Sequence, residues 1–308
     1  MTAAMNRLRF RAMGTDVEML VADGAPVEAD GALQCARDEM ERLEAMLSRF
    51  RQDSDVSRIN AAPGQWVTVR EETVRVLELA KQAFDETEGL FNPCLGQVLE
   101  HIGYDVSFEQ VEGRPVVRLN SSHPYEAPTT CPFEINPSQH RVLLHPGYKL
   151  DLGGIAKGWI VQRSALVLEQ WGMRNFLVSA GGDLVCRGSN GERPWCVGIA
   201  NPFGGEGDNV LMLDVTDMAV ATSGTYRRRW SFHGTPVHHL IHPYFGVPAA
   251  SDVVSCSALH PDLVRAEVLA KVGLLLGADA GRQWLQKRAV GGFVLVLKSG
   301  EVVHAWNS

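Results

Sequence analysis

The chain has 308 residues, of which 45% are hydrophobic and 21% are charged, and its formal net charge is −7 at pH 7. This composition is ordinary for a globular protein with a large core, and the length allows one large domain or two. The negative charge argues against non-specific binding to nucleic acid, which depends on clustered lysine and arginine. No stretch approaches about eighteen uninterrupted apolar residues, so we expect no membrane span.

The six cysteines are scattered along the chain and form no C-x-x-C motif. This pattern favours reduced thiols in a reducing compartment. The first residues contain no apolar segment typical of a signal peptide and no lipobox, so we expect a cytoplasmic protein. The cysteines are Cys35, Cys94, Cys131, Cys186, Cys196 and Cys256.

The first third of the chain reads as strands followed by helices. Residues 7–22 indicate two strands around Met13-Gly14-Thr15. Apolar residues at a spacing of three and four predict a helix over 29–50 and another over 72–87, with Gly89 as the residue that ends the second. Between them, residues 53–60 predict a short helix capped by Asp53 or Ser54.

The rest of the chain mixes strands and helices without strict alternation. Residues 107–140 are rich in Ser, Pro and Thr and indicate an irregular insertion or a hairpin region rather than a domain boundary. Such a mixed order favours the α+β class, and we expect a single domain over 1–308. We predict helices over 155–171 and 263–276, strands over 176–178, 195–199 and 210–213, and a terminal hairpin over 293–297 and 301–304.

The most informative stretch runs from Leu150 to Gly158, where an apolar run ends in Asp151 and two glycines precede Lys157. Glycine lets the backbone approach a ligand closely, and the N–H groups that open the next helix favour anions. The stretch matches neither the Rossmann fingerprint nor the P-loop. It indicates a diphosphate site, and the alternative is an ordinary strand-to-helix turn with a solvated lysine.

Nine short motifs, of which this glycine turn is one, follow one another in a fixed order. Together they resemble the ApbE family of flavin transferases, formerly called thiamine-biosynthesis lipoproteins, over nearly the whole chain. The motifs are Met13-Gly14-Thr15; Leu47-Ser48-Arg49-Phe50 with Ser57-Arg58-Ile59-Asn60; Gly89-Leu90-Phe91-Asn92-Pro93; Asp151 to Gly158; Ser179-Ala180-Gly181-Gly182-Asp183; Trp195-Cys196-Val197-Gly198-Ile199 with Pro202; Ala221-Thr222-Ser223-Gly224; His238-His239-Leu240-Ile241; and Gly246-Val247-Pro248.

The resemblance implies an ApbE-like, T-fold-related architecture of mixed antiparallel sheets with packed helices. It also implies an enzyme that binds FAD, cleaves the FAD diphosphate with Mg²⁺, and transfers FMN to a threonine or serine hydroxyl of a target flavoprotein. Some members only hydrolyse FAD to FMN and AMP. By the same resemblance, the residues that bind FAD are Met13, Phe50, Ile102, Gly103, Tyr104, Asp151, Lys157, Thr222 and Ile241.

Two of the implied roles have plain structural alternatives. His239 matches the family histidine near the chemistry and has the right chemical type to take a hydroxyl proton. However, one of two adjacent histidines is usually structural. Thr222 and its neighbours Ser223 and Gly224 offer hydroxyls to a phosphate, or they form a tight turn at the end of a strand. The glycines at 181 and 182 most simply let two backbones approach closely.

The implied metal site is where the chain departs most from the family. The family uses an Asp and, four residues later, a Thr, together with backbone oxygens; here these positions are Glu267 and Lys271, and the backbone oxygens are those of Gly154 and Ala270. A lysine cannot ligate Mg²⁺, because its ammonium has only donors. At about 4 Å it would repel a divalent ion by several kcal/mol at an effective dielectric near 20.

Two interpretations of this departure remain open. Lys271 takes the place of the metal and binds the diphosphate directly, or Glu267 and Lys271 form an i,i+4 pair on a solvent-facing helix, worth roughly 0.2–0.5 kcal/mol. Other charged positions of the family are also neutral or basic here, at Asn92, Gln162 and His242. The leading hypothesis is therefore an FAD:protein FMN transferase, and the alternative is an FAD- or FMN-binding protein with a degenerate metal site and little or no transferase activity.

Overall fold

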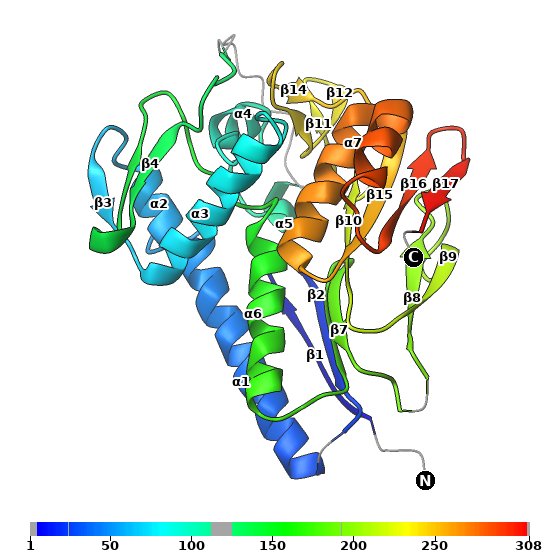
Figure 1. The fold of residues 1–308 in the computed structure, drawn as a ribbon. Helices are drawn as coiled ribbons and strands as arrows, with labels where there is room; N and C mark the ends of the chain where they lie inside the picture. The colour runs from blue at the N-terminus through cyan, green and yellow to red at the C-terminus, as the bar shows by residue number, and fades with distance from the viewer. Residues whose placement is uncertain (1–4, 24, 112–124, 192, 307–308) are drawn as a thin grey trace. The chain divides into compact units, whose positions relative to one another are not determined.

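The computed structural model describes residues 5–23, 25–111, 125–191 and 193–306 (Figure 1). The chain separates into two compact units. The first unit comprises Met1–Glu44, Lys157–Gly224 and Asp252–Ser308, and the second comprises Ala45–Ala156 and Thr225–Ser251. The expectation of a single domain over 1–308 stays a prediction.

The first unit is built on an eight-stranded sheet in which every neighbouring pair is antiparallel. The strand order is β1-β2-β6-β7-β10-β15-β16-β17. Segments far apart in the sequence thus become neighbours, since β7 pairs with β10 and β10 pairs with β15. The strands are β1 (Asn6–Ala12), β2 (Thr15–Val21), β6 (Phe176–Ala180), β7 (Asp183–Arg187), β10 (Ala219–Gly224), β15 (Val253–His260), β16 (Gly292–Leu297) and β17 (Val302–Ala305).

The predicted hairpin around Met13 is confirmed, and its turn needs an unusual backbone. Met13 has φ 53° and Gly14 has φ 65°, so both residues between the strands are left-handed. Two-residue hairpin loops favour positive φ at both positions, because that twist matches the twist of the strands. Gly181 allows a second close approach, since a Cβ there would lie 2.4 Å from Thr15 Oγ1.

Helices and a two-stranded ribbon complete the first unit. α7 (Leu263–Gln286) contacts β10, β15 and β16, and Figure 1 shows it lying along these strands. The helix is interrupted at Gly277, with φ 81°, one residue after the predicted end at 276, and then continues. The ribbon of β8 (Trp195–Ala200) and β9 (Asn209–Val215) shares a hydrophobic core with the large sheet. The other helices are α1 (Pro26–Leu47), whose last turn belongs to the second unit, and α6 (Ala156–Gln170).

The second unit is made of short elements around a smaller core. That core combines α4, residues 102–111 and Ile241, and Trp230 and Phe232 pack against it. The helices are α2 (Asp55–Asn60), α3 (Glu71–Glu86), α4 (Gly96–His101), α5 (Phe108–Val111) and the 3₁₀ helix η1 (Pro137–Gln139). The strands are β3 (Trp66–Thr68), β4 (Phe133–Asn136), β5 (Arg141–Leu144), β11 (Arg229–Phe232), β12 (Thr235–His238), β13 (Ile241–His242) and β14 (Val247–Pro248).

The α+β class is confirmed, and two local predictions need correction. Gly89 is not the first residue beyond the cap of α3, because Thr87 is the cap and Glu88, with φ 54°, takes the left-handed position. Thr222 lies within a six-residue strand, so the tight-turn interpretation of that motif is wrong. The expected insertion over 107–140 is partly regular, since it contains α5, β4 and η1; its residues 112–124 lie outside the described residues.

Two expectations drawn from composition can be compared with the structure. All six cysteines are free thiols. Among the residues that the structure describes, none of the helices combines the length and the apolarity that crossing a membrane requires.

Asp55 is a fully buried carboxylate that ties α2 to α3. It follows the cap residue Ser54, and its oxygens accept hydrogen bonds from the Arg70 backbone N–H at 2.9 Å and the Thr73 hydroxyl at 2.8 Å. It also pairs with the guanidinium groups of Arg58 and Arg70. Such a buried carboxylate is costly to remove, because the buried Thr73 hydroxyl would then lose its acceptor.

We expect Asp55→Ala to lower the free energy of unfolding by about 3 kcal/mol, because it leaves a buried hydroxyl and a backbone N–H unsatisfied. Urea unfolding followed by circular dichroism measures the change. Asp53→Ala is the matched control, since Asp53 is exposed and its ion pair with Arg51 spans 3.6 Å; we expect a change below about 0.5 kcal/mol. Equal midpoints for the two variants would contradict the structural role of Asp55.

Candidate functional site

Three elements of the first unit bring the charged side chains of Lys157, Asp183 and Glu267 together. With Gly158, which takes part through its backbone N–H, these residues form what we call the Lys157 cluster. Lys157 lies in the first turn of α6, Asp183 opens β7 and Glu267 lies in α7. The Lys157 ammonium forms an ion pair with Asp183 Oδ2 and lies 3.9 Å from Glu267 Oε1. The alternative interpretation with a solvated lysine is therefore wrong, because Lys157 bridges two nearly buried carboxylates.

The remaining oxygens of both acids accept backbone hydrogen bonds. Asp183 Oδ1 accepts one from the Thr222 N–H at 3.0 Å, and Glu267 Oε2 accepts one from the Gly158 N–H at 2.9 Å. Glu267 thus satisfies one of the N–H groups that the first turn of α6 leaves without a partner inside the helix. A carboxylate at this end of a helix is also favoured by the helix dipole.

Gly158 is required by how closely α6 and α7 approach each other. A Cβ on residue 158 would lie 2.6 Å from Glu267 Oε2 and 3.3 Å from the Leu263 carbonyl oxygen. Because the second of these atoms belongs to the backbone, a side chain at 158 would push the two helices apart. The glycine of the sequence motif therefore serves helix packing at this position.

Thr222 contributes to the Lys157 cluster through its backbone. Its hydroxyl lies 2.7 Å from the Ser257 hydroxyl, across the antiparallel pair of β10 and β15. Side chains alternate along a strand, so Thr222 shares a face of the sheet with Val220, which packs in the core under the β8–β9 ribbon. Asp183 alternates to the other face, since its neighbour Leu184 lies in that same core.

The residues implied for Mg²⁺ do not fit a divalent cation. Every carboxylate oxygen of Asp183 and Glu267 already lies against Lys157 or a backbone N–H, and Ala270 lies inside α7, where its carbonyl faces the next turn. Lys271 offers only donors. Among the described residues, no group of three or more His, Cys, Asp or Glu side chains is placed to hold a metal ion.

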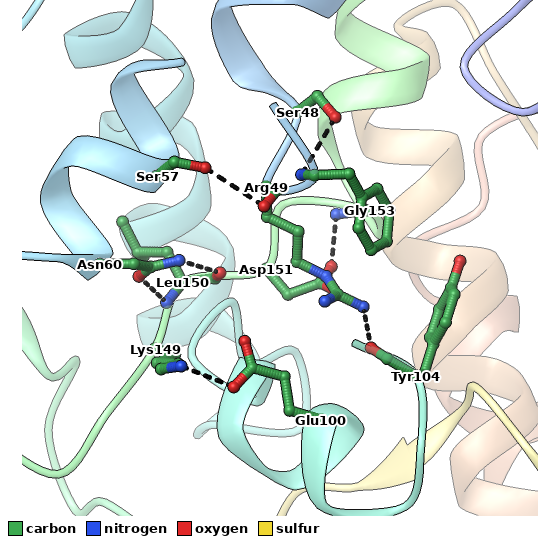
Figure 2. A network of polar contacts seen from close by, with 11 residues as sticks. Ser48, Arg49, Ser57, Asn60, Glu100, Tyr104, Lys149, Leu150, Asp151 and Gly153 are labelled. Carbon is green, nitrogen blue, oxygen red and sulfur yellow. Dashed lines mark hydrogen bonds and ion pairs between the residues drawn. The ribbon is translucent and has the colours of Figure 1, made fainter. Parts of the chain in front are cut away.

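The second unit holds a separate group of side chains, the Arg49 cluster, defined as Arg49, Phe50, Tyr104, Asp151 and Trp230. The Arg49 Nε donates to Asp151 Oδ2 at 2.6 Å, and its terminal nitrogen donates to the Tyr104 carbonyl at 2.7 Å (Figure 2). The guanidinium also lies over the rings of Phe50 and Tyr104, 4.2 and 4.8 Å from their centroids. Arg49 therefore connects the acid of the glycine turn to the aromatic residues.

The glycine turn itself is held by hydrogen bonds from all sides. Asp151 Oδ1 accepts a hydrogen bond from the Gly153 N–H at 2.8 Å. The Asn60 side-chain amide donates through Nδ2 to the Leu150 carbonyl and accepts through Oδ1 from the Leu150 N–H (Figure 2). Lys149 donates to Glu100 at 2.6 Å. The turn is therefore preorganised, with Asp151 fixed by Arg49 and by the turn that it caps.

In the aromatic part of the Arg49 cluster, one ring is buried and another is partly exposed. Tyr104 is buried and lies 5.7 Å from the Phe50 ring and 5.4 Å from the Trp230 ring, whereas Phe50 is 39% exposed. Burial raises the pKa of the Tyr104 phenol, so the ring stays neutral at physiological pH. The Trp230 indole N–H donates to the Ile102 carbonyl at 2.6 Å, and Gly103, with φ 90°, turns the chain between Ile102 and Tyr104.

The other predicted site residues lie as follows. His239 is half buried in the short link between β12 and β13. The Nε2 atom of its neighbour His238 lies 3.2 Å from the Ala249 carbonyl oxygen. Ile241 is buried in the core of the second unit. Met13 is half buried at the β1–β2 turn of the first unit, and Gly154 lies in the glycine turn of the second.

Four residues of these clusters, Gly158, Asp183, Arg49 and Trp230, were not predicted as site residues. Asp183 and Arg49 both stood inside recognised motifs, but neither motif says which of its side chains carries the charge interaction. Trp230 lay beside the basic run Arg227 to Arg229, which gave no indication that its indole would pack on Tyr104. The signal for Asp183 was an acid directly after two glycines, Gly181 and Gly182.

Comparisons with known proteins agree with the pattern of motifs. A protein of Klebsiella pneumoniae (strain 342) named FAD:protein FMN transferase is 28% identical over 97% of this chain and 86% of its own length. One of the same name from Treponema pallidum (strain Nichols) is 30% identical over 82% of this chain and 73% of its own length. The crystal structure of the ApbE protein from Thermotoga maritima matches with a TM-score of 0.82 at 28% identity, over 98% of this chain and 97% of that one.

The expected ApbE-like fold is thus confirmed, and the family model gives the extent of the likeness. That model is described as the ApbE family and matches residues 13–294, which include every residue of the Lys157 and Arg49 clusters. A match of this length leaves no other assignment for the chain, which belongs to the ApbE family.

Proposed function

We propose that this chain is an FAD:protein FMN transferase, an enzyme that moves FMN from FAD to a hydroxyl group of a target flavoprotein. The observation that carries the proposal is the likeness to curated proteins of that name across 97% of the chain. The preorganised glycine turn and the Lys157 and Arg49 clusters support it. Free thiols are typical of a reducing compartment, which supports a cytoplasmic location as part of the same proposal.

The reaction breaks one bond of the FAD diphosphate. The acceptor hydroxyl oxygen attacks the phosphorus of the FMN half, the P–O bond to the AMP half breaks, AMP leaves with the bridging oxygen, and the hydroxyl proton passes to a base. Such a reaction needs a positioned acceptor, neutralisation of the diphosphate charge, and little covalent help from the protein. With water as the acceptor, the products are FMN and AMP.

The two clusters offer different chemistry, each within its own unit. Within the first unit, the proposed phosphate contact is Lys157 at the first turn of α6, which keeps its ion pairs with Asp183 and Glu267 and so holds a helix N-terminus in place. Within the second unit, Phe50 and Tyr104 offer aromatic faces for a planar ring, and Asp151 offers a carboxylate beside them. His239 is proposed as the base. The remaining implied contacts, Met13, Ile102, Gly103, Thr222 and Ile241, belong to the same proposal.

The first test follows the products. We expect the purified protein to convert FAD to AMP and to attach FMN to a flavoprotein that carries a threonine acceptor, because the family members of this name do so. Chromatography measures AMP, and in-gel fluorescence after denaturation measures covalent flavin on the acceptor. The Thr→Ala form of the acceptor is the control. If FAD binds but neither AMP nor labelled acceptor forms, the flavin-binding alternative replaces the transferase.

The second test addresses the aromatic surface. We expect Phe50→Ala to weaken FAD binding roughly three- to tenfold, about 0.5–1.5 kcal/mol, because an exposed ring available for stacking is lost. Quenching of flavin fluorescence measures the dissociation constant. Phe203→Ala is the matched control, since Phe203 is also an exposed phenylalanine and lies outside both clusters. Equal affinities for the two variants would remove Phe50 from the flavin site.

The third test separates a base from a binding residue. We expect His239→Ala to lower kcat for FMN transfer by about a hundredfold, the range of a lost general base, while the dissociation constant for FAD changes less than about twofold. His304→Ala, which changes an exposed histidine of β17, is the control and should leave kcat unchanged. A His239→Ala variant with normal kcat would show that the residue is structural.

A further inference from the structure

Lys271 balances the charge that the Lys157 cluster leaves over. The ammonium of Lys157 and the carboxylates of Asp183 and Glu267 sum to a formal charge of −1, and Lys271 brings the sum of these four groups to zero. Lys271 stands four residues after Glu267 in α7, and therefore on the same face of that helix. A group of carboxylates attracts Mg²⁺ only when its negative charge is in excess.

We propose that this chain binds the diphosphate of FAD without a divalent cation, and that the ammonium of Lys271 supplies the positive charge that a metal would otherwise bring. This inference rests on the proposed function. Lys157 is committed to Asp183 and Glu267, whose oxygens are also bonded to backbone N–H groups. The single charge of Lys157 offsets only one of the two carboxylates, so Lys271, on the face of α7 that carries Glu267, is the cation that offsets the other and meets the diphosphate.

The solvent-facing pair that the sequence left open does not agree with the burial of these residues. Glu267 is only 6% exposed, and Lys271 is half buried. Exposed i,i+4 pairs lie on a helix surface in water, whereas Glu267 faces α6 and bonds to Gly158. The half-buried position of Lys271 also strengthens its interaction with an anion, because charges interact more strongly away from bulk water.

The substitutions in α7 are consistent with one another. Glutamate is one methylene longer than the aspartate of the family pattern, and its Oε2 reaches the Gly158 N–H at 2.9 Å. A carboxylate used in this way is turned toward the protein rather than toward a metal. The lysine one turn later then supplies a charge at the position where the family pattern has a metal-ligating hydroxyl.

The experiment measures FAD binding to the full chain by fluorescence quenching, once with EDTA and once with excess MgCl₂. For the unaltered protein we expect dissociation constants that agree within about twofold in the two buffers. For Lys271→Thr we expect binding in EDTA to weaken about tenfold or more, because one cation at the diphosphate is lost. Lys287→Thr removes the same charge from the exposed end of α7 and should bind FAD normally.

Metal binding gives a second readout that is independent of FAD. Titration with Mn²⁺, followed by its electron paramagnetic resonance signal, should show no site in the unaltered protein. Lys271→Gln removes the charge but keeps a long polar side chain, and it serves if the threonine variant fails to fold; it should weaken FAD binding in EDTA as well. Thermal unfolding checks that each variant is folded.

The outcomes separate this inference from the proposed function. FAD binding that EDTA abolishes and Mg²⁺ restores in the unaltered protein would overturn the metal-free site and leave the transferase intact. Normal binding in EDTA by both Lys271 variants would also overturn it, since another group would then hold the diphosphate. Absence of FAD binding in both buffers would instead refute the proposed function itself.

Discussion

The ion pairs of Lys157 are the interaction on which the first unit most depends. One ammonium joins the first turn of α6, the start of β7 and the N-terminal part of α7 through Asp183 and Glu267. Both acids are nearly buried, so each needs a partner, and without Lys157 two negative charges would face each other in a poorly solvated place. The cluster thus fixes the position of a helix N-terminus and holds a lysine there, the two features that an anion site requires.

Arg49 does in the second unit what Lys157 does in the first. Its guanidinium is planar and has several donors, so it binds Asp151 and the Tyr104 carbonyl while it lies over two rings. A lysine at position 49 would hold the carboxylate but would lose the stacking and the second directed bond. The Leu-Ser-Arg-Phe motif therefore has a physical meaning, since the arginine orders the turn and the phenylalanine after it stays partly exposed.

The sequence predicted elements well where periodicity was strong and poorly where tertiary contacts decide. The β1–β2 hairpin, α1, α3, α6 and the first part of α7 lie close to their expected ranges, because each has a regular apolar pattern. β15 was missed although it is central in the sheet; it is buried on both faces and therefore shows no alternation. The role of Asp183 was missed for a different reason, since its partners come from α6 and β10, 26 and 39 residues away.

The same distinction explains why the departures in α7 were visible in the sequence while their meaning was not. Lys271 could be seen to lack acceptors, but whether it belonged to a surface pair or to a site depended on the burial of Glu267. Gly158 explains the burial of Glu267, because only a residue without a Cβ lets Glu267 come within hydrogen-bond distance of the α6 backbone. Glycine at 158, glutamate at 267 and lysine at 271 are therefore best understood as one set. A change at any one of them alters the charge or the space available to the other two.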